Sequence, residues 1–395
     1  MKSFLQYLIP AFLMLAACSK QDIEPEPVGK PVTGEKGPDK TWQEILNTSS
    51  YTLFRSALQR AQMTDMLQAS ASTTLLVPDD NAFIAAGWTA DRISKATPAE
   101  LKAMLSVHIM PIFLDLTSIE TVPGNIPAVT LSKRLLGGHG NWSGDYTDVQ
   151  FLGKHGDSLL VNGRAENKWS AAISASNGTI FPITHVLEAP QQTMWEYIES
   201  NPDYSMYHAA LTISDSLYTE SWISLGVMDA IKSNPAYAQF TLFVPTNAAF
   251  AKAGFHTPED ILDYIMTRSY PIPYADYDEN LYYVQPTTAM DSLLMANGLE
   301  VAMALGVYNN TKGGLVFFSN DLADNASQLS WLKLMNGQIY NTPPVYISLD
   351  FKAVNGQPLV KRHGVNQAYI PLSKKDHRVI NGVVHEVDDL FKLPN

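Results

Sequence analysis

Two stretches decide the predicted fold of this chain: TTLLVPDDNAF at residues 73–83 and FTLFVPTNAAF at residues 240–250. Each takes a run of apolar and β-prone residues into a proline, and then passes through polar residues to Ala-Phe. Runs rich in Leu, Val and Phe predict short strands. Because proline cannot donate to a sheet ladder, we expect the strands to end at Pro78 and Pro245.

A helix should begin directly after each of these strands. Asp79 and Thr246 carry side-chain oxygens that can accept hydrogen bonds from the free backbone N–H groups of a helix start, so both are predicted N-caps. Phe83 and Phe250 follow four residues later. They should lie on the face of the helix that turns into the core.

Two further phrases recur in the same order. YTLFRSAL (51–58) is echoed by YSMYHAAL (204–211), and NGTIFPITHVLEAP (177–190) by NGVVHEVDDLFKLP (381–394). Three phrases repeated in order indicate duplicated domains. We predict domains at residues 41–190 and 191–395, with the boundary near Ala189–Gln192.

Between these phrases the sequence predicts further local structure. The segments 97–110 and 257–266 have the spacing of helices, with His108 on the apolar face of the first. Each closing phrase begins with Asn-Gly, which indicates a turn with positive φ, and should continue as an alternating strand. His108 is therefore interpreted as a hydrogen-bonded core residue, with a role in binding as the alternative.

Together these motifs resemble a fasciclin domain. The N-terminal half carries the strand-Pro corner, the segment VHIMP (107–111) and the Asn-Gly closing phrase, whereas the C-terminal half keeps the first and third, with Tyr264 near the position of His108. His385 stands in its closing phrase where the family often has a histidine. The resemblance implies an α+β fold of two tandem fasciclin-like domains, each a β-sandwich-like wedge with packed helices.

The first residues resemble a bacterial lipoprotein signal. Lys2 precedes an apolar run, and Leu-Ala-Ala-Cys ends at Cys18. The run is shorter than the roughly 20 apolar residues of a membrane-spanning helix. Residues 1–17 are therefore predicted to be a signal peptide and Cys18 the lipidated residue; the alternative is an unmodified cysteine after a cleaved signal.

Residues 18–40 are rich in proline, glycine and charge, so we predict a lipidated flexible tether. At about 3 Å per residue it reaches on the order of 70 Å when extended. Asp22, Glu24 and Glu26 resemble a surface-export signal of lipoproteins, although they also suit a solvated linker. The expected location is the outer membrane, lipid-anchored at the cell surface, with a periplasm-facing anchor as the alternative.

Composition and motif content bear on the function class. The chain has 395 residues, enough for two cores, and a formal net charge of −12, which argues against a nucleic-acid partner. HExxH, GxSxG, P-loop and GxGxxG patterns are absent from the sequence, and its single cysteine gives no zinc-ligand pair. We expect no enzyme activity, no cofactor and no metal, with a hydrolase assembled from distant loops left as a remote alternative.

The C-terminal half is longer, which points to a candidate binding region. Its strand-to-closing-phrase interval, Thr241 to Asn381, spans 140 residues against 103 for Thr74 to Asn177. Tyrosines can stack on sugar rings or anchor a protein interface, or simply pack the insertion onto its own domain. The predicted binding residues are Tyr270, Tyr274, Tyr277, Tyr282 and Tyr283 of the insertion, Trp142 and Tyr146 of the segment 137–146, and His108.

The sequence thus predicts a lipid-anchored, non-enzymatic adhesion protein of the cell surface. Its partners would be the membrane, through the anchor, and an extracellular protein or matrix glycan. The alternative is an accessory glycan-binding lipoprotein of a polysaccharide-uptake system.

Overall fold

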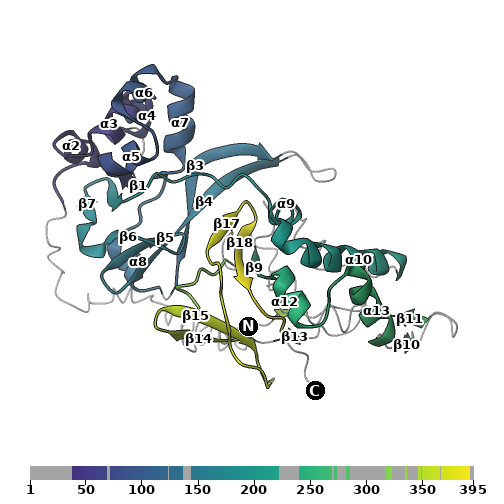
Figure 1. The fold of residues 1–395 in the computed structure, drawn as a ribbon. Helices are drawn as coiled ribbons and strands as arrows, with labels where there is room; N and C mark the ends of the chain where they lie inside the picture. Colours follow the sequence, from purple (N-terminus) through teal and green to yellow (C-terminus); the bar gives the residue numbers. More distant parts are fainter. Residues whose placement is uncertain are drawn as a thin grey trace, which may run out of the picture. The chain divides into compact units, whose positions relative to one another are not determined.

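The computed structural model divides the chain between Asp39 and Lys40, and every element below lies in the compact unit Lys40–Asn395. Figure 1 traces its helices and strands. The structure describes residues 38–68, 72–122, 124–136, 144–221, 240–268, 271–273, 282–284, 316–322, 334–335, 346–347, 349–364 and 366–391.

Helices occur in both halves of this unit, next to several sheets, which confirms the predicted α+β class. In residues 41–190, the N-terminal half, they are α2 (Trp42–Asn47), α3 (Thr52–Arg60), α4 (Met63–Gln68), α5 (Asp80–Ala85), α6 (Ala90–Lys95), α7 (Pro98–Ser106), α8 (Leu116–Glu120) and the 3-10 turn η1 (Trp169–Ala171). In residues 191–395, the C-terminal half, they are α9 (Met194–Ser200), η2 (Pro202–Tyr204), α10 (Ser205–Ser221), α12 (Asn247–Lys252) and α13 (Pro258–Arg268).

The opening and closing phrases of each half pair as parallel strands. In the N-terminal half the sheet order is β2 (Ile109–Met110), β1 (Thr73–Pro78), β8 (Gly178–Ile183) and β7 (Ile173–Ala175), with β1 parallel to β8. In the C-terminal half it is β17 (His377–Val379), β18 (Gly382–Val387) and β9 (Phe240–Pro245), with β18 parallel to β9. The same pairing is therefore built twice.

The remaining strands form antiparallel sheets and ribbons. The N-terminal half has a four-stranded sheet of β3 (Ile126–Leu136), β4 (Gly144–His155), β5 (Ser158–Val161) and β6 (Arg164–Lys168). The C-terminal half has a three-stranded sheet of β14 (Leu349–Val354), β15 (Gln357–Arg362) and β16 (Ile370–Pro371), and the ribbons β10 (Pro271–Pro273) with β11 (Tyr282–Val284) and β12 (Leu334–Met335) with β13 (Tyr346–Ile347).

The closing strands are buried along their whole length. Every residue of β8 and of β18 is buried, so the predicted alternation of buried and exposed positions was wrong. The reason is that apolar clusters cover both faces of the pair: Ile180 belongs to a cluster with the helices, and Phe181 to a second cluster on the other face. Parallel strands covered on both faces read as continuous apolar runs.

The strand-to-helix corners are built as the sequence predicts. Asp79 Oδ1 accepts a hydrogen bond from Ala82 N at 2.7 Å, and Thr246 Oγ1 accepts one from Ala249 N at 3.2 Å. Phe83 and Phe250 are both fully buried. Both N-caps and both core phenylalanines are thus confirmed.

The predicted helix at residues 97–110 needs a correction. It ends at Ser106, and Ile109–Met110 instead form β2, which pairs antiparallel with β1. His108 therefore lies in the turn between α7 and β2 rather than on a helix face. Ile109 and Met110 pair with β1 and their side chains are fully buried, which favours a strand at these residues over another turn of the helix.

The structure requires glycine at residue 178 for a different reason from the predicted turn with positive φ. Asn177 and Gly178 do not adopt positive φ. A Cβ atom at residue 178 would lie 1.8 Å from Thr73 O, so the close approach of β1 requires the glycine.

Most of the core divides between the two halves. Two clusters draw only on the N-terminal half and two only on the C-terminal half. A small fifth cluster draws on both, and its members are Val149, Phe151, Val316, Phe318 and Val383. The exact domain bounds stay a prediction.

Candidate functional site

Four of the predicted binding residues lie outside the described residues, namely Trp142, Tyr270, Tyr274 and Tyr277. The predicted lipidation site, Cys18, also lies outside them. Tyr282 and Tyr283 belong to β11, where their backbones pair with Pro273 and Ile272 of β10. Their role in binding stays a prediction.

His108 lies in the core of the N-terminal half. It is fully buried, its Nε2 accepts a hydrogen bond from Leu187 N at 2.8 Å, and its Nδ1 lies 3.0 Å from Met104 O. Burial lowers the pKa of His108 to about 3. The ring is therefore neutral, with its proton on Nδ1 facing Met104 O, and it ties the end of α7 to the segment after β8.

Tyr146, one of the predicted binding residues, does not lie at the surface. Its side chain is fully buried on β4, and its hydroxyl donates to Ile380 O of the C-terminal half at 2.7 Å. Burial raises the pKa of Tyr146 to about 12. As placed, this side chain offers no surface to an outside ligand and instead joins the two halves.

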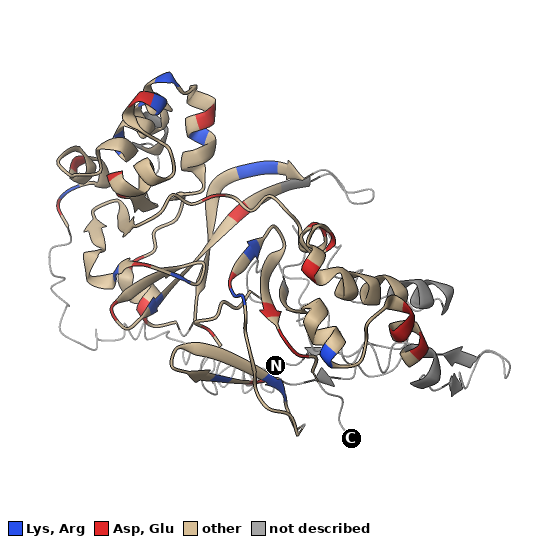
Figure 2. Cartoon of the chain, in the orientation of Figure 1, with Lys and Arg blue, Asp and Glu red and all other residues tan. Residues whose placement is uncertain are grey.

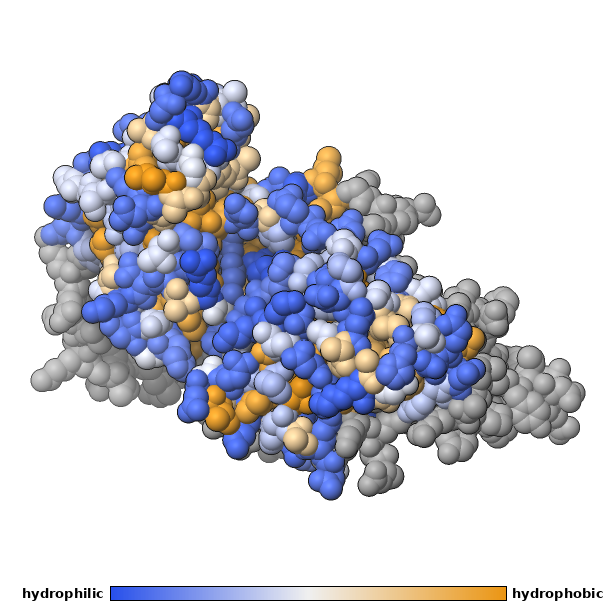
Figure 3. Space-filling view, in the orientation of Figure 1, coloured by the Kyte–Doolittle hydropathy of each residue, from blue (hydrophilic) through white to orange (hydrophobic). Residues whose placement is uncertain are grey.

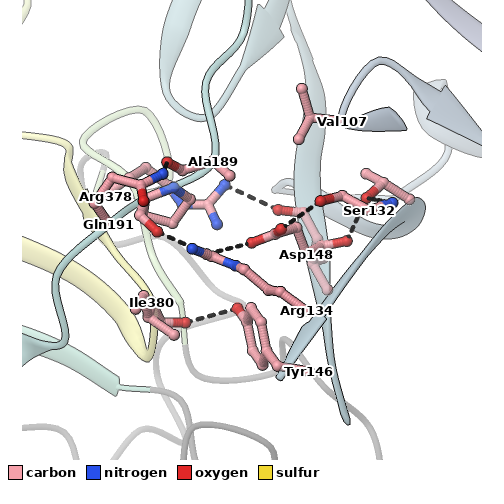
Figure 4. Close-up of polar contacts among 12 residues, drawn as sticks. Val107, Ser132, Arg134, Tyr146, Asp148, Ala189, Gln191, Arg378 and Ile380 are labelled. Carbon is pink, nitrogen blue, oxygen red and sulfur yellow. Dashed lines mark hydrogen bonds and ion pairs between the residues drawn. The ribbon is translucent and has the colours of Figure 1, made fainter. Parts of the chain in front are cut away.

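Tyr146 is part of a polar contact between the halves, which we call the seam (Figure 4). Arg378 of β17 donates from Nη1 to Val149 O and to Asn162 Oδ1, both at 2.9 Å. Its guanidinium lies 5.3 Å from the centre of the Phe151 ring. Burial lowers the pKa of Arg378 from its ordinary value, yet the group remains a cation far above neutral pH.

A second arginine contacts the link between the halves. Arg134 Nη2 forms an ion pair with Asp148 Oδ1 at 2.7 Å and donates to Pro190 O at 2.6 Å. Ser132 Oγ donates to the other oxygen of Asp148 at 2.7 Å. The Asp148 carboxylate is almost completely buried, so these donors hold both of its oxygens in place.

The seam continues at residues 316–322 of the C-terminal half. Asn125 donates from its backbone N to Asp321 Oδ1 at 3.1 Å and from Nδ2 to Asp321 Oδ2 at 2.7 Å. The ring centres of Phe151 and Phe318 lie 5.3 Å apart. The seam thus combines an apolar centre with hydrogen-bonded polar groups around it, which is the usual anatomy of a specific interface.

Sequence reasoning missed the seam. Its partners are far apart along the chain, 234 residues for Tyr146 and Ile380, so no local pattern connects them. One indication was present: Arg378 is a charged residue three positions before the closing phrase, which begins at Asn381. A charge at the edge of a buried strand needs partners, but the sequence does not say which ones.

A carboxylate–histidine pair is the arrangement most like a catalytic one. His185 Nδ1 lies 2.7 Å from Oε1 of Glu166, whose side chain is fully buried. The hydroxyl and backbone N of Thr184 both donate to the other oxygen of Glu166, at 3.1 and 3.0 Å. The hydroxyl therefore serves the carboxylate and is not placed to be activated by His185.

Within the part of the chain that the structure describes, three or more His, Cys, Asp or Glu side chains do not gather as a metal site. Over the same residues, no helix combines the length and the apolar character needed to cross a bilayer. Figure 2 shows basic and acidic residues scattered along the elements.

Comparison with known proteins agrees with the sequence motifs in the N-terminal half. Residues 49–190 match the family described as Fasciclin domain. Fasciclin domains are associated with cell adhesion and are generally non-enzymatic. The predicted resemblance is thus confirmed for this part of the chain.

One solved structure has a related description. It is a FAS1 domain pair from the insect cell adhesion molecule fasciclin I, similar at 15% identity over 87% of this chain and 97% of that chain, with a TM-score of 0.32. No curated protein matches the chain.

Proposed function

We propose that this chain is a lipid-anchored, non-enzymatic adhesion protein of the cell surface that binds an extracellular protein or a matrix glycan. The match of residues 49–190 to the Fasciclin domain carries the proposal, because domains of that family are associated with adhesion. The partner would be held by the surface of the paired halves.

The buried ionisable groups support a binding role over a catalytic one. His108 ties two backbone segments together, and Glu386 accepts hydrogen bonds from Tyr204 Oη at 2.7 Å and from Lys374 Nζ at 2.9 Å. Each of these groups is used by the fold itself. The face shown in Figure 3 is mostly hydrophilic, with apolar residues scattered over it, as suits a protein that works in water.

The anchor is proposed from the segment before the compact unit. Cys18 follows the apolar run, and the unit begins at Lys40, which supports a tether over the residues between them. Two or three acyl chains would hold the protein stably, because each buried methylene contributes about 0.8 kcal/mol. The anchor would present the paired halves away from the lipid surface.

The anchor can be tested in cells. The wild-type protein should remain in the outer-membrane fraction and take up labelled palmitate, whereas Cys18→Ser should be released without label. Added protease should remove the compact unit from intact cells if the anchor faces outward. Protection until the cells are opened would favour the periplasm-facing alternative.

Adhesion can be tested with the full chain. Beads coated with wild-type protein should adhere to a panel of extracellular matrix proteins or matrix glycans more than beads coated with heat-unfolded protein. Equal adhesion by both preparations would contradict the proposal. Turnover of any polysaccharide, abolished by a single carboxylate substitution, would show a hydrolase instead.

The second candidate is an accessory glycan-binding lipoprotein, favoured by the tyrosines of segment 267–288. A glycan array separates it from the first. Saturable binding of wild-type protein that is lost in Tyr274→Ala with Tyr282→Ala would favour this candidate. Phe113→Ala, a change at an aromatic side chain that is 49% exposed in the other half, is the matched control.

A further inference from the structure

The sheet of β14, β15 and β16 has one face in the core and one face at the surface. Each strand contributes a buried apolar residue to the same cluster, and these residues are Phe351, Val360 and Ile370. Because successive side chains of a strand point to opposite faces, the neighbours of these three lie on the other face. Lys352 of β14, Lys361 of β15 and Tyr369, directly before β16, are such neighbours, and none of them is buried.

The two lysines converge on one aromatic ring. Lys361 Nζ lies 4.9 Å from the centre of the Tyr369 ring, and Lys352 Nζ lies 5.9 Å from it. An ammonium group within about 6 Å of an aromatic ring is attracted by the electrons of the ring. The Tyr369 ring therefore offsets part of the repulsion between two like charges and holds both ammonium groups over a small area.

Carboxylates compensate this positive charge only in part. Lys361 Nζ lies 3.8 Å from Asp350 Oδ2, whereas the other oxygen of Asp350 has a closer partner, His363 Nδ1, at 2.8 Å. The exposed Lys352 forms no ion pair within the part of the chain that the structure describes. This face of the sheet thus carries two ammonium groups and one carboxylate.

Apolar side chains lie beside the lysines on the same face. Leu359 is paired with Lys352 on one side and with Pro371 on the other. Val354 follows Lys352 by two residues and is 41% exposed, and Pro371 is exposed as well. Residues two apart on one strand lie about 7 Å apart, so cationic and apolar groups alternate over short distances.

We propose that this surface, the lysine face of Lys352, Leu359, Lys361 and Tyr369, binds an acidic polysaccharide. The carboxylate or sulfate groups of the polymer would contact the two ammonium groups, and the apolar C–H faces of its sugar rings would contact the apolar side chains. The inference rests on the proposed adhesion function, for which it names the class of partner and the surface. The net charge of −12 does not oppose it, because charges more than about 8 Å away are largely screened at physiological ionic strength.

Three forms of one polymer test the class of partner: dextran, carboxymethyl dextran and dextran sulfate. The full chain should bind at least one acidic form saturably, and the affinity should fall as the salt concentration rises. Binding of one acidic form alone would identify the acidic group as carboxylate or sulfate. Binding of neither acidic form, or equal binding of neutral dextran, overturns the proposal. Polyglutamate that binds more tightly than both acidic dextrans overturns the assignment to a glycan.

Paired variants test the surface. Lys352→Gln with Lys361→Gln should weaken binding of the acidic dextran about tenfold. Lys102→Gln with Lys133→Gln removes the same charge at two exposed lysines of the N-terminal half and should bind like the wild type. An equal loss in both pairs would show attraction to the overall charge and would overturn the lysine face.

The ring has its own test. Tyr369→Leu removes the ring that holds the ammonium groups and should weaken binding about threefold. Tyr369→Phe keeps the ring and should bind like the wild type. An equal loss in both variants would contradict the role of the ring in positioning the lysines.

Hydrogen exchange of the wild-type chain decides the place of binding even if a variant unfolds the sheet. Bound polymer should slow exchange in β14 and β15 and leave β5 and β6 unchanged, whereas slowing only outside the sheet overturns the lysine face. Beads that adhere to a matrix protein while the chain binds no acidic dextran would overturn the lysine face and leave the adhesion function standing. Binding of acidic dextran without adhesion to any matrix component would contradict the adhesion function instead.

Discussion

The two halves of the chain share a strand-to-helix corner and a parallel pair of strands, but they differ in the length of the chain between these elements. In both, a strand ends at a proline, an oxygen caps the next helix, and a phenylalanine enters the core. In both, the strand pairs in parallel with a closing strand that starts at Asn-Gly. The corner and the pair are the parts that the repeat preserves.

In each half, a threonine on the strand before the corner accepts a hydrogen bond from a backbone N–H further along the chain. The two N–H groups therefore occupy equivalent positions in the two halves. Thr74 Oγ1 accepts from Leu114 N at 2.9 Å, and Thr241 Oγ1 accepts from Phe317 N at 2.8 Å. Leu114 comes 40 residues after Thr74, whereas Phe317 comes 76 residues after Thr241. The rest of the chain up to the closing asparagine is nearly equal in length, at 63 and 64 residues.

The extra length of the C-terminal half therefore lies before Phe317. It also lies after the α13 cap, because Thr97 to Leu114 spans 17 residues and Thr257 to Phe317 spans 60. The tyrosine-rich segment 267–288 falls in this interval. The comparison teaches that a fold anchored on both sides tolerates a long insertion, since the entropy of loop closure grows slowly with length.

The largest expected effect concerns the corner phenylalanines. Phe83→Ala and Phe250→Ala each remove a fully buried ring, and we expect each to lower the free energy of unfolding of its own half by about 3–5 kcal/mol. Denaturant unfolding with hydrogen exchange resolved by half would measure this. Ile84→Ala, at a side chain that is 54% exposed, should change stability by less than about 0.5 kcal/mol.

The same pair of variants tests whether the halves are independent. If Phe83→Ala loosens the C-terminal half as much as the N-terminal half, the two halves unfold as one cooperative unit and are not independent.

A smaller effect is expected at the seam, which has no counterpart within either half. Arg378→Met removes the donor to Val149 O and one donor to Asn162, and should destabilise the contact between the halves by about 2–3 kcal/mol. Exchange of the Tyr146 and Val149 region should increase while the α7 region stays protected. Lys102→Met on the exposed face of α7 is the control, and an equal effect there would argue against the seam.

A pH effect should distinguish the two cores. Burial lowers the pKa of His108 to about 3 from 6.5, so the unfolded chain binds more protons between these values and stability falls as pH drops below about 6.5. The N-terminal half should lose about 2 kcal/mol between pH 7.5 and pH 5. His108→Gln should remove this loss in urea unfolding curves at the two pH values.

The matched control for that experiment is His363→Gln, because this histidine is 68% exposed on its side chain. It should keep the wild-type pH dependence.

The smallest expected effects are at the helix caps. Asp79→Ala and Thr246→Ala each remove the acceptor for a free backbone N–H, and each should cost about 1 kcal/mol. Thr246→Asp should retain most of the stability because it keeps an acceptor. Thermal unfolding of the four proteins would show this, and a loss in Thr246→Asp as large as in Thr246→Ala would mean that the cap is not the reason for the threonine.

Parts of the fold could be predicted because they depend on neighbours in the chain. The caps at Asp79 and Thr246 join groups three residues apart, and the strand end at Pro78 depends on proline alone. The end of the helix at Ser106 was missed because pairing of Ile109 with Leu75 decided it. The burial of Tyr146 was missed for the same reason, since its partner Ile380 is far along the chain.

The amino-acid sequence by itself determined the repeated corners, the α+β class and the resemblance to the fasciclin domain, because each depends on residue types at short spacing. The tertiary structure alone decided that β1 and β8 pair in parallel, that His108 serves the core, and that Arg378 and Asp321 join the halves. These contacts depend on which distant groups meet after the chain has folded. The partners of a buried charged group, and therefore its pKa, are determined by these tertiary contacts.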